Sequence, residues 1–394
     1  MEKTAFEKKY AVERRGTRSV KWDGLAGKFG DPDLIALWVA DMDFKCPDSV
    51  REALAKTVEH GAFGYYDVPQ SYYDAFIAWE KERHGYEVKQ EWLRYTPGVV
   101  AGIFGSVNAF SAPGDACMVL SPVYSPFMNA IEQNGRKLVC CPLVEENGVY
   151  SVNFTDFEQK IVDNNVKIFI LCSPHNPIGR VWRREELEKF LEICRKYHVF
   201  VISDEIHQDI IMSGYTQIPT ATVGNYHDML ITLTAPSKTF NLAGCQNSIA
   251  IIPDEKVRAQ FETSCKVMNI FGGSSFGYIA AEAAYAQGAQ WLEGALETIE
   301  RNYRYLRDTL TKELPGVVVS PLEGTYLAWI DLKAVLGGRS LVETVQDKAR
   351  LAVDFGDWFI RDETAKDDRH IRVNLAASGD IVEQAVANLI KAVR

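Results

Sequence analysis

Short apolar runs alternate with longer amphipathic segments through the middle of the chain. The apolar runs predict buried strands at Cys117–Leu120, Lys137–Cys140, Lys167–Cys172, Val199–Ser203, Met229–Leu233 and Ser248–Ile252. Between the third and fourth runs, Arg184–His198 places Leu187, Phe190, Leu191 and Cys194 at helical spacing. Such alternation predicts an α/β fold with a largely parallel sheet covered by helices.

The flanking segments follow different patterns. Before the alternating region, helices are predicted after the turn Cys46–Ser49, over Ser71–His84 and from Val99 to Phe104, whereas Ala11–Arg15 suggests an extended arm. After it come a mostly helical stretch over Glu282–Leu314, short strands at Tyr326–Asp331 and His370–Asn374, and helices over Leu341–Ala349 and Asp380–Val393. We therefore predict a large domain over residues 49–289, and a smaller α+β domain formed by an N-terminal arm, 1–48, and residues 290–394.

The composition and charge of the chain limit the kinds of molecule that it can be expected to bind. The chain has 394 residues, of which 47% are hydrophobic and 24% charged, and a formal net charge of −10. This acidic balance argues against nucleic acid or a membrane surface as the main partner. No apolar run reaches the length of a membrane-spanning helix, and the N-terminus has no signal-peptide pattern. The eight cysteines form no C-x-x-C motif, so we expect free thiols and a cytoplasmic location.

The run Met229–Leu233 leads into Lys238, which lies directly after Ser237. A lysine just past the end of a strand occupies the position where α/β folds carry their chemistry. It can be a Schiff-base nucleophile whose amine reacts when desolvation lowers its pKa. Taken alone, it can equally be a solvated charge on a loop, so the rest of the chain must decide.

Two other strand ends carry candidate partners of a cofactor. Asp204 follows Val199–Ser203 and could pair with a protonated ring nitrogen. It could instead cap a helix, or join Glu205, His207 and Asp209 as a metal ligand, although no second cluster of ligands accompanies them. Asn176, after Lys167–Cys172, could donate to a phenolate-type oxygen, or simply belong to a turn rich in proline and glycine.

Three further positions are weaker candidates. The turn Thr96–Gly102 begins a helix whose free N–H groups could hold a phosphate, and the chain has no P-loop and no dinucleotide-binding motif. Tyr124 could stack on a flat ring or be a packed aromatic residue. Arg372 lies in an apolar strand and could bind a substrate carboxylate or form a structural ion pair.

In combination, these motifs resemble the fold-type I, aspartate-aminotransferase-like family of pyridoxal 5′-phosphate (PLP) enzymes. The motifs that carry the resemblance are Asn176–Gly179, Asp204–Glu205, Ser237–Lys238 and Arg372, in that order. Within the family the chain is most similar to the MalY/PatB-like cystathionine β-lyase branch, through the stretches Trp38–Phe44, Thr96–Val100, Ser173–Trp182, Asp204–His207, Ala235–Gly244 and Gly324–Trp329. The resemblance implies a seven-stranded, mostly parallel sheet in the large domain.

The resemblance also implies roles for individual residues. Lys238 would be the Schiff-base lysine and the general base at the substrate Cα. Asp204 would pair with the ring nitrogen, Asn176 would meet the ring hydroxyl and Tyr124 would stack on the ring. The phosphate would be held by the backbone at Val100 and Ala101, by Ser237, and by Tyr65 of a second subunit in a homodimer. His207 would also lie at the cofactor, and Arg372 with the Val39–Ala40 backbone would bind the substrate carboxylate.

Two positions depart from the aminotransferases of this family. His207 stands where they carry a tyrosine, and Gln246 where they carry a phosphate-binding arginine. We therefore expect a carbon–sulfur β-lyase that converts L-cystathionine or related cysteine conjugates to a thiol, pyruvate and ammonia. The alternatives are a PLP-dependent aminotransferase, which shares every step up to the carbanion, and a regulatory or binding protein on the same fold.

Overall fold

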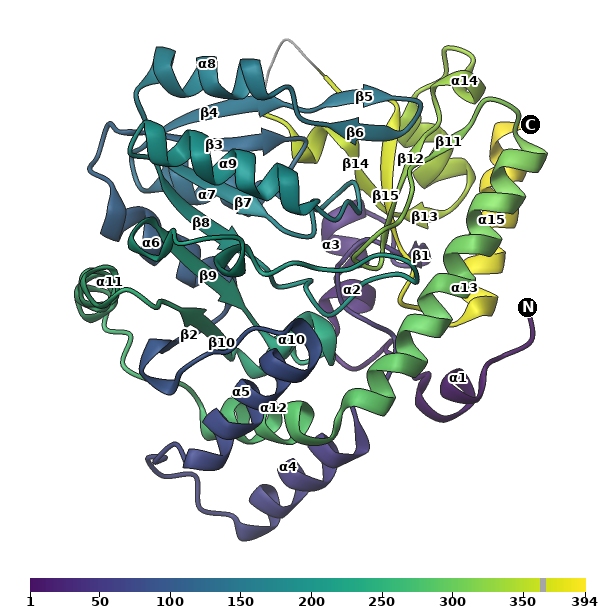
Figure 1. Cartoon of the computed structure of the whole chain (residues 1–394). Coiled ribbons are helices and arrows are strands. Elements are labelled where there is room, and N and C mark those ends of the chain that lie inside the picture. Colours follow the sequence, from purple (N-terminus) through teal and green to yellow (C-terminus); the bar gives the residue numbers. More distant parts are fainter. Residues whose placement is uncertain (362–365) are drawn as a thin grey trace.

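The computed structural model describes residues 1–361 and 366–394. A seven-stranded sheet forms its centre, with the strand order β2-β10-β9-β8-β7-β3-β4 (Figure 1). The strands are β2 (Leu93–Thr96), β3 (Ala116–Ser121), β4 (Lys137–Pro142), β7 (Val166–Cys172), β8 (Phe200–Asp204), β9 (Leu230–Thr234) and β10 (Ser248–Ile251). All neighbours from β9 to β4 are parallel, and β10 is antiparallel to both β9 and β2. The predicted seven-stranded, mostly parallel sheet is confirmed.

Helices cover both faces of this sheet because its central strands are apolar on both sides. In β7, Ile168 and Ile170 pack into one layer, and Phe169 and Leu171 into the other. The first layer contains α6 (Val99–Phe110), α7 (Ser125–Gln133) and α11 (Glu255–Val267). The second contains α8 (Phe154–Asn164) and α9 (Arg184–Lys196), and the hairpin β5 (Val144–Glu146) and β6 (Val149–Ser151) extends from β4. Nearer the chain start lie α4 (Asp48–His60) and α5 (Gln70–His84), which contact α12 (Ser275–Gln287).

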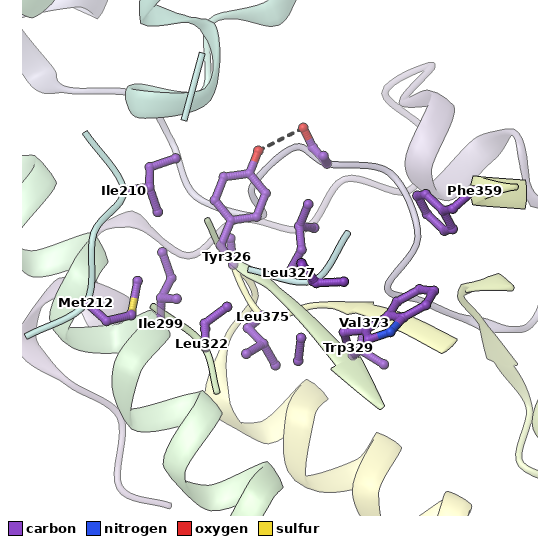
Figure 2. Close-up of a cluster of buried hydrophobic side chains, with 14 of the residues drawn as sticks. Ile210, Met212, Ile299, Leu322, Tyr326, Leu327, Trp329, Phe359, Val373 and Leu375 are labelled. Carbon is purple, nitrogen blue, oxygen red and sulfur yellow. Dashed lines mark hydrogen bonds between the residues drawn. The ribbon is translucent and has the colours of Figure 1, made fainter. Parts of the chain in front are cut away.

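The C-terminal part contains a second, antiparallel sheet with the order β11-β12-β15-β14. Its strands are β11 (Val318–Val319), β12 (Leu327–Asp331), β15 (His370–Asn374) and β14 (Asp354–Phe355), and its helices include α13 (Ala289–Glu313), α14 (Lys333–Leu336) and α15 (Gly379–Val393). Figure 2 shows apolar side chains of β12 and β15, among them Leu327 and Val373, gathered in the core beside α13. This sheet carries the predicted substrate-binding Arg372.

The N-terminal segment lies against the C-terminal part. It forms α1 (Ala5–Tyr10), α2 (Val20–Asp23), α3 (Leu25–Phe29) and β1 (Ile35–Ala36), and β1 pairs in parallel with β13 (Leu351–Ala352). The Phe6 ring of α1 packs edge-on against Trp291 of α13. These contacts agree with grouping residues 1–48 and 290–394 in one domain, and that boundary stays a prediction.

Several elements differ from the sequence-based expectations. The helical stretch Glu282–Leu314 is divided between α12 and α13 at Gly288. The segment Leu341–Ala349 has a π-helical core, η5, at Glu343–Lys348. The strand β2 was not predicted, because four residues beside a turn carry little periodic signal. None of the eight cysteines forms a disulfide in the part of the chain that the structure describes. None of the described helices is long and apolar enough to cross a membrane.

Candidate active site

A cavity of about 230 Å³ opens at the carboxyl ends of β7, β8 and β9. Its lining includes nine of the residues singled out from the sequence, namely Ala40, Val100, Ala101, Tyr124, Asn176, Asp204, His207, Ser237 and Lys238. Carboxyl ends of parallel strands share one edge of a sheet, which explains why segments far apart in the chain meet there. Arg372 adjoins the cavity through Asn176, whereas Tyr65 lies away from it on an exposed loop.

Lys238 lies in the short helix α10 (Pro236–Thr239), which begins directly after β9. Its Nζ donates a hydrogen bond to the Ala40 carbonyl at 2.6 Å. Burial in the cavity wall lowers the pKa of Lys238 to about 8, with the nearby Arg372 charge acting in the same direction. The unprotonated amine, which is the state that attacks a carbonyl carbon, is therefore far more populated near neutral pH than in a solvated lysine. The lysine is not a solvated loop charge.

Asp204 is the last residue of β8, and its side chain is buried. Its Oδ1 accepts a hydrogen bond from the Ile206 backbone N–H at 3.0 Å, so it closes a turn and caps no helix. Burial raises the pKa of Asp204 to about 7, with the Ile206 contact opposing that rise. A buried carboxylate of this kind is stabilised by a cationic partner that enters the cavity.

Asn176 and Arg372 meet behind the cavity. The Asn176 Oδ1 accepts a hydrogen bond from Arg372 Nη1 at 2.8 Å. Arg372 Nη2 donates to the Trp38 carbonyl at 3.1 Å and also contacts the carboxylate of Asp354. The guanidinium lies 4.9 Å from the centre of the Phe359 ring. Arg372 therefore forms the structural ion pair that the sequence left open, at the place where a carboxylate-binding arginine is expected.

The start of α6 forms another wall of the cavity. Gly98 precedes the helix with φ +102°, a conformation that residues with a Cβ rarely adopt. No side chain caps this helix, so the amides of its first turn are free of helical partners and Val100 and Ala101 face the cavity. Ser237 lies on the same cavity. A helix start beside a serine hydroxyl is suited to an anion such as a phosphate.

Tyr124 and His207 also line the cavity. Tyr124 immediately precedes α7, and its ring lies edge-on to Phe127 at 5.9 Å. Burial and the positive charges of Lys238 and Arg372 lower the pKa of His207 well below its usual value. His207 is thus a neutral, buried imidazole that packs edge-on against the Tyr326 ring at 5.8 Å.

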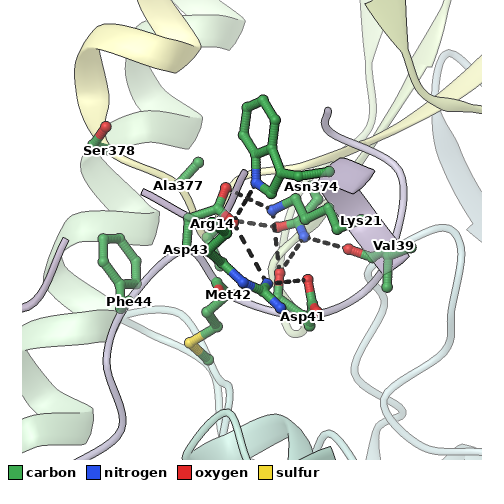
Figure 3. Close-up of polar contacts among 12 residues, drawn as sticks. Arg14, Lys21, Val39, Asp41, Met42, Asp43, Phe44, Asn374, Ala377 and Ser378 are labelled. Atoms are coloured by element: carbon green, nitrogen blue, oxygen red, sulfur yellow. Dashed lines mark hydrogen bonds and ion pairs between the residues drawn. The ribbon is translucent and has the colours of Figure 1, made fainter. Parts of the chain in front are cut away.

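The Val39–Ala40 backbone is held in place by side chains from distant parts of the chain. The Ala40 carbonyl accepts hydrogen bonds from both Lys238 and the Tyr326 hydroxyl, the latter at 2.8 Å (Figure 2). Asn374 Nδ2 donates to the carbonyls of Val39 and Asp41, at 2.6 and 2.7 Å (Figure 3). This anchoring fixes the position of the segment that faces the Lys238 amine.

Some residues of the site carried no recognised signal in the sequence. Asn247 lines the cavity beside Gln246, and its Nδ2 is buried without a partner in the described part of the chain. Asp354 lies in a two-residue strand, too short for any periodic pattern. Tyr326 was predicted only as a strand residue. Each of these positions gains its role from tertiary contacts.

A larger hollow of about 630 Å³ lies elsewhere, between α5, α13 and residues 208–217. It contains none of the residues predicted to bind the cofactor or the substrate, and its lining includes His84 and Asp209, whose Nε2 and Oδ1 atoms lie 2.8 Å apart. Among the residues that the structure describes, no group of histidine, cysteine, aspartate and glutamate side chains is arranged to hold a metal ion. The chemistry indicated by the sequence is concentrated in the smaller cavity.

Comparisons with known proteins agree with this placement. The family model for class I and II aminotransferases matches residues 32–389. The chain is 42% identical over 346 residues to the cystathionine β-lyase PatB of Bacillus subtilis (strain 168), covering 87% of this chain and 89% of that protein. A PLP-bound structure from Clostridium difficile 630, provisionally named an aminotransferase, superposes with a TM-score of 0.93 and 37% identity over 98% of this chain and 99% of that one. The PLP-bound C–S lyase of Staphylococcus hominis gives a TM-score of 0.90 and 33% identity over 97% of both chains.

Proposed function

Because the chain belongs to the family of class I and II aminotransferases, we propose that it is a PLP-dependent carbon–sulfur β-lyase. The reaction would be the α,β-elimination of L-cystathionine, or of a related cysteine conjugate, to a thiol, pyruvate and ammonia. The observation that carries the proposal is the convergence of Lys238, Asp204 and Asn176 on one cavity beside an uncapped helix start.

The residues present fit PLP. Lys238 supplies an amine with a lowered pKa, and Asp204 supplies a buried carboxylate suited to a protonated ring nitrogen. Asn176 engages Arg372 through Oδ1, which leaves its Nδ2 to donate to a ring oxygen. The first turn of α6 and Ser237 would hold the phosphate, and Tyr124 would cover the ring. When bound, PLP supplies a ring that accepts the electron pair released at the substrate Cα.

The protein's own part in the reaction is binding and proton movement. The α-carboxylate of the substrate would be bound by Arg372, which orients the amino acid. Lys238 Nζ would be the general base that removes the proton from the substrate Cα. The Ala40 carbonyl, which accepts from Nζ at 2.6 Å, would steer this amine. Asp204 would keep a proton on the cofactor ring, and the sulfur at Cβ would then leave as a thiol.

The rival function is transamination, in which the proton returns to the cofactor instead of a thiol leaving. The provisional name of the Clostridium difficile structure favours this alternative. The lyase is favoured by the names of PatB and of the Staphylococcus hominis protein, and by two positions in the cavity. There, His207 and Gln246 stand where related aminotransferases carry tyrosine and arginine.

The test is to incubate the PLP-loaded protein with L-cystathionine in the absence of any 2-oxo acid. A lyase produces homocysteine, pyruvate and ammonia in equal amounts. Product formation only after a 2-oxo acid is added would refute the lyase and establish the aminotransferase. Cystine and other cysteine conjugates, assayed in the same way, would identify the preferred leaving thiol.

A further inference from the structure

The ion pair between Arg372 and Asp354 lies inside the proposed substrate site. Both residues are buried, with 4% and 7% of their surfaces exposed. A guanidinium has five N–H bonds, one on Nε and two on each terminal nitrogen. Nη2 of Arg372 donates both of its hydrogens, one to the Trp38 carbonyl and one to the Asp354 carboxylate. Nη1 donates to Asn176, and the buried Nε has no acceptor in the described part of the chain.

This inventory conflicts with bidentate binding of a further carboxylate. A carboxylate binds two neighbouring N–H groups in the plane of the guanidinium. The guanidinium of Arg372 offers two such pairs of N–H groups, Nε with Nη2 and Nη1 with Nη2. Both pairs include Nη2. An incoming carboxylate must therefore displace the Trp38 carbonyl or Asp354. If both carboxylates stayed on one buried guanidinium, an uncompensated negative charge would remain.

Asp354 is the more easily displaced of the two. It belongs to β14, an edge strand of the four-stranded sheet that pairs only with β15. Burial raises the pKa of Asp354, while the positive charges of Arg372 and Lys28 act in the opposite direction. Lys28 is exposed and lies 4.2 Å from the centre of the Trp358 ring, so a second cation is available near Asp354. The Trp38 carbonyl, in contrast, is part of the anchored backbone beside Val39.

We propose that Asp354 determines substrate affinity by competing with the α-carboxylate of the substrate for Arg372. The inference rests on the proposed role of Arg372 and goes beyond it. In the ligand-free protein Asp354 neutralises the buried guanidinium, and ligand binding transfers that contact to the substrate. Removing the negative charge at position 354 therefore strengthens the binding of ligands that carry a carboxylate, and leaves otherwise similar ligands unaffected.

The experiment measures the binding of glycine and of methylamine to the PLP-loaded protein by calorimetry. Glycine has no β-substituent, so no elimination can follow, and methylamine lacks the carboxylate. The readout is the ratio of the two dissociation constants, methylamine over glycine, after each constant is corrected for the unprotonated fraction of its amine. We expect Asp354→Asn to raise this ratio at least fivefold above wild type. A smaller rise, no change or a fall overturns the proposal.

Two control variants separate this proposal from the proposed function. Asp33→Asn removes the same charge from an exposed position and should leave the ratio unchanged. Arg372→Gln should reduce the ratio to about one. If Arg372→Gln instead keeps the wild-type ratio, Arg372 does not bind the carboxylate, and the inference about Asp354 fails with that assignment. If the protein shows no lyase activity on L-cystathionine, the proposed lyase is refuted. The measured ratios, and with them the inference about Asp354, are unaffected by that result.

Removing one partner of a buried ion pair can prevent folding, so wild-type protein supplies a second measurement. An arginine free of competition should make glycine bind more than about tenfold more tightly than methylamine, after correction for the unprotonated fraction of each amine. Competition by Asp354 predicts a wild-type ratio below ten. A ratio above ten overturns the proposal even if Asp354→Asn cannot be purified.

Discussion

The amine of Lys238 has a fixed position and a lowered pKa. It is held in a cavity wall by the Ala40 carbonyl, and its pKa is lowered to about 8 by burial. The first property sets where the amine can react, and the second raises the population of its reactive form. The two together suit the proposed roles of Lys238, which are to tether a cofactor and to move a proton.

The lysine assignment predicts where borohydride attaches the cofactor. Lys238→Ala should bind PLP without a covalent link, so borohydride should attach no PLP to the variant, whereas it should fix PLP to Lys238 of wild type. Lys45→Ala, at an exposed lysine, should remain like wild type. Mass spectrometry of the borohydride-treated proteins measures the attachment. A Lys238→Ala protein to which borohydride still fixes PLP would refute the assignment.

The raised pKa of Asp204 predicts how stability varies with pH in PLP-free protein. The folded state holds the Asp204 proton up to a pKa of about 7, whereas the unfolded chain releases it near the ordinary value of 3.8. The folded state therefore loses stability as pH rises between those values, and the loss is complete above the folded pKa. Asp204→Asn lacks this loss.

The free energy of unfolding of Asp204→Asn, relative to wild type, should thus increase by about 2 kcal/mol between pH 5 and pH 8. Urea denaturation of the PLP-free proteins at the two pH values measures it. Because both proteins share the other buried carboxylates, such as Glu80 and Glu205, the difference isolates Asp204. An equal difference at both pH values, or a decrease, would contradict the raised pKa.

Residues at strand ends could be predicted from the sequence because an apolar run fixes where its strand stops. Lys238, Asp204 and Asn176 each follow such a run, and the structure brings all three to one cavity. The roles assigned to them stay predictions. Asp354 could not be found in this way, because its contact with Arg372 depends on the register between β14 and β15.

At the scale of elements, the N-terminal segment supports the cavity from behind. Lys21 of α2 is fully buried, and its Nζ donates to Asp43 at 2.8 Å and to the Asp41 carbonyl at 3.3 Å. Arg14 Nη1 contacts the Asp41 carboxylate at 2.9 Å (Figure 3). These contacts hold the backbone that continues into Ala40, the acceptor of the Lys238 hydrogen bond.

This network predicts a large cost for Lys21→Ala. Removing Lys21 leaves the buried Asp43 carboxylate with only the longer ion-pair contact to Arg14 Nη1, at 3.6 Å, among the described residues, so the free energy of unfolding should fall by about 3 kcal/mol. Lys45→Ala, at an exposed position, should change it by less than about 0.5 kcal/mol. Urea denaturation of the PLP-loaded proteins measures both values. A cost for Lys21→Ala as small as that of Lys45→Ala would show that the ion pair contributes little.

The elements themselves were predicted well where the hydrophobic pattern was clear. The helix expected at Arg184–His198 is α9, and the strand expected at His370–Asn374 is β15 with the same bounds. The chain start was predicted poorly, since only an extended arm was expected there. The signal existed in Thr4 and Glu7, whose side chains and backbones form a capping box at the start of α1.

At the scale of the whole molecule, one loop and its surroundings expose several aromatic side chains. Phe63 is 59% exposed, Phe271 is 73% exposed, and Tyr65 makes no contact with the cavity of its own chain. Exposed aromatic side chains of this kind are common at protein interfaces. The prediction that two chains associate, with Tyr65 reaching the phosphate of the partner's cofactor, would give this surface a function.

We predict that the PLP-loaded protein sediments as a homodimer. Tyr65→Phe removes one hydroxyl donor to the phosphate, so PLP should dissociate about tenfold more readily, with the dimer unchanged. Tyr305→Phe is the matched control, because Tyr305 lies on α13, away from the cavity. Sedimentation and PLP titration test both parts. A monomer, or unchanged PLP affinity in Tyr65→Phe, would remove Tyr65 from the site.

In the proposed lyase reaction, the electrons released at Cα expel a thiol. The most direct measurement counts pyruvate molecules formed per active site from L-cystathionine, with no 2-oxo acid present. The lyase predicts many turnovers per site and equal amounts of homocysteine. At most one amino-group transfer per site, with further product only after a 2-oxo acid is added, would contradict the account.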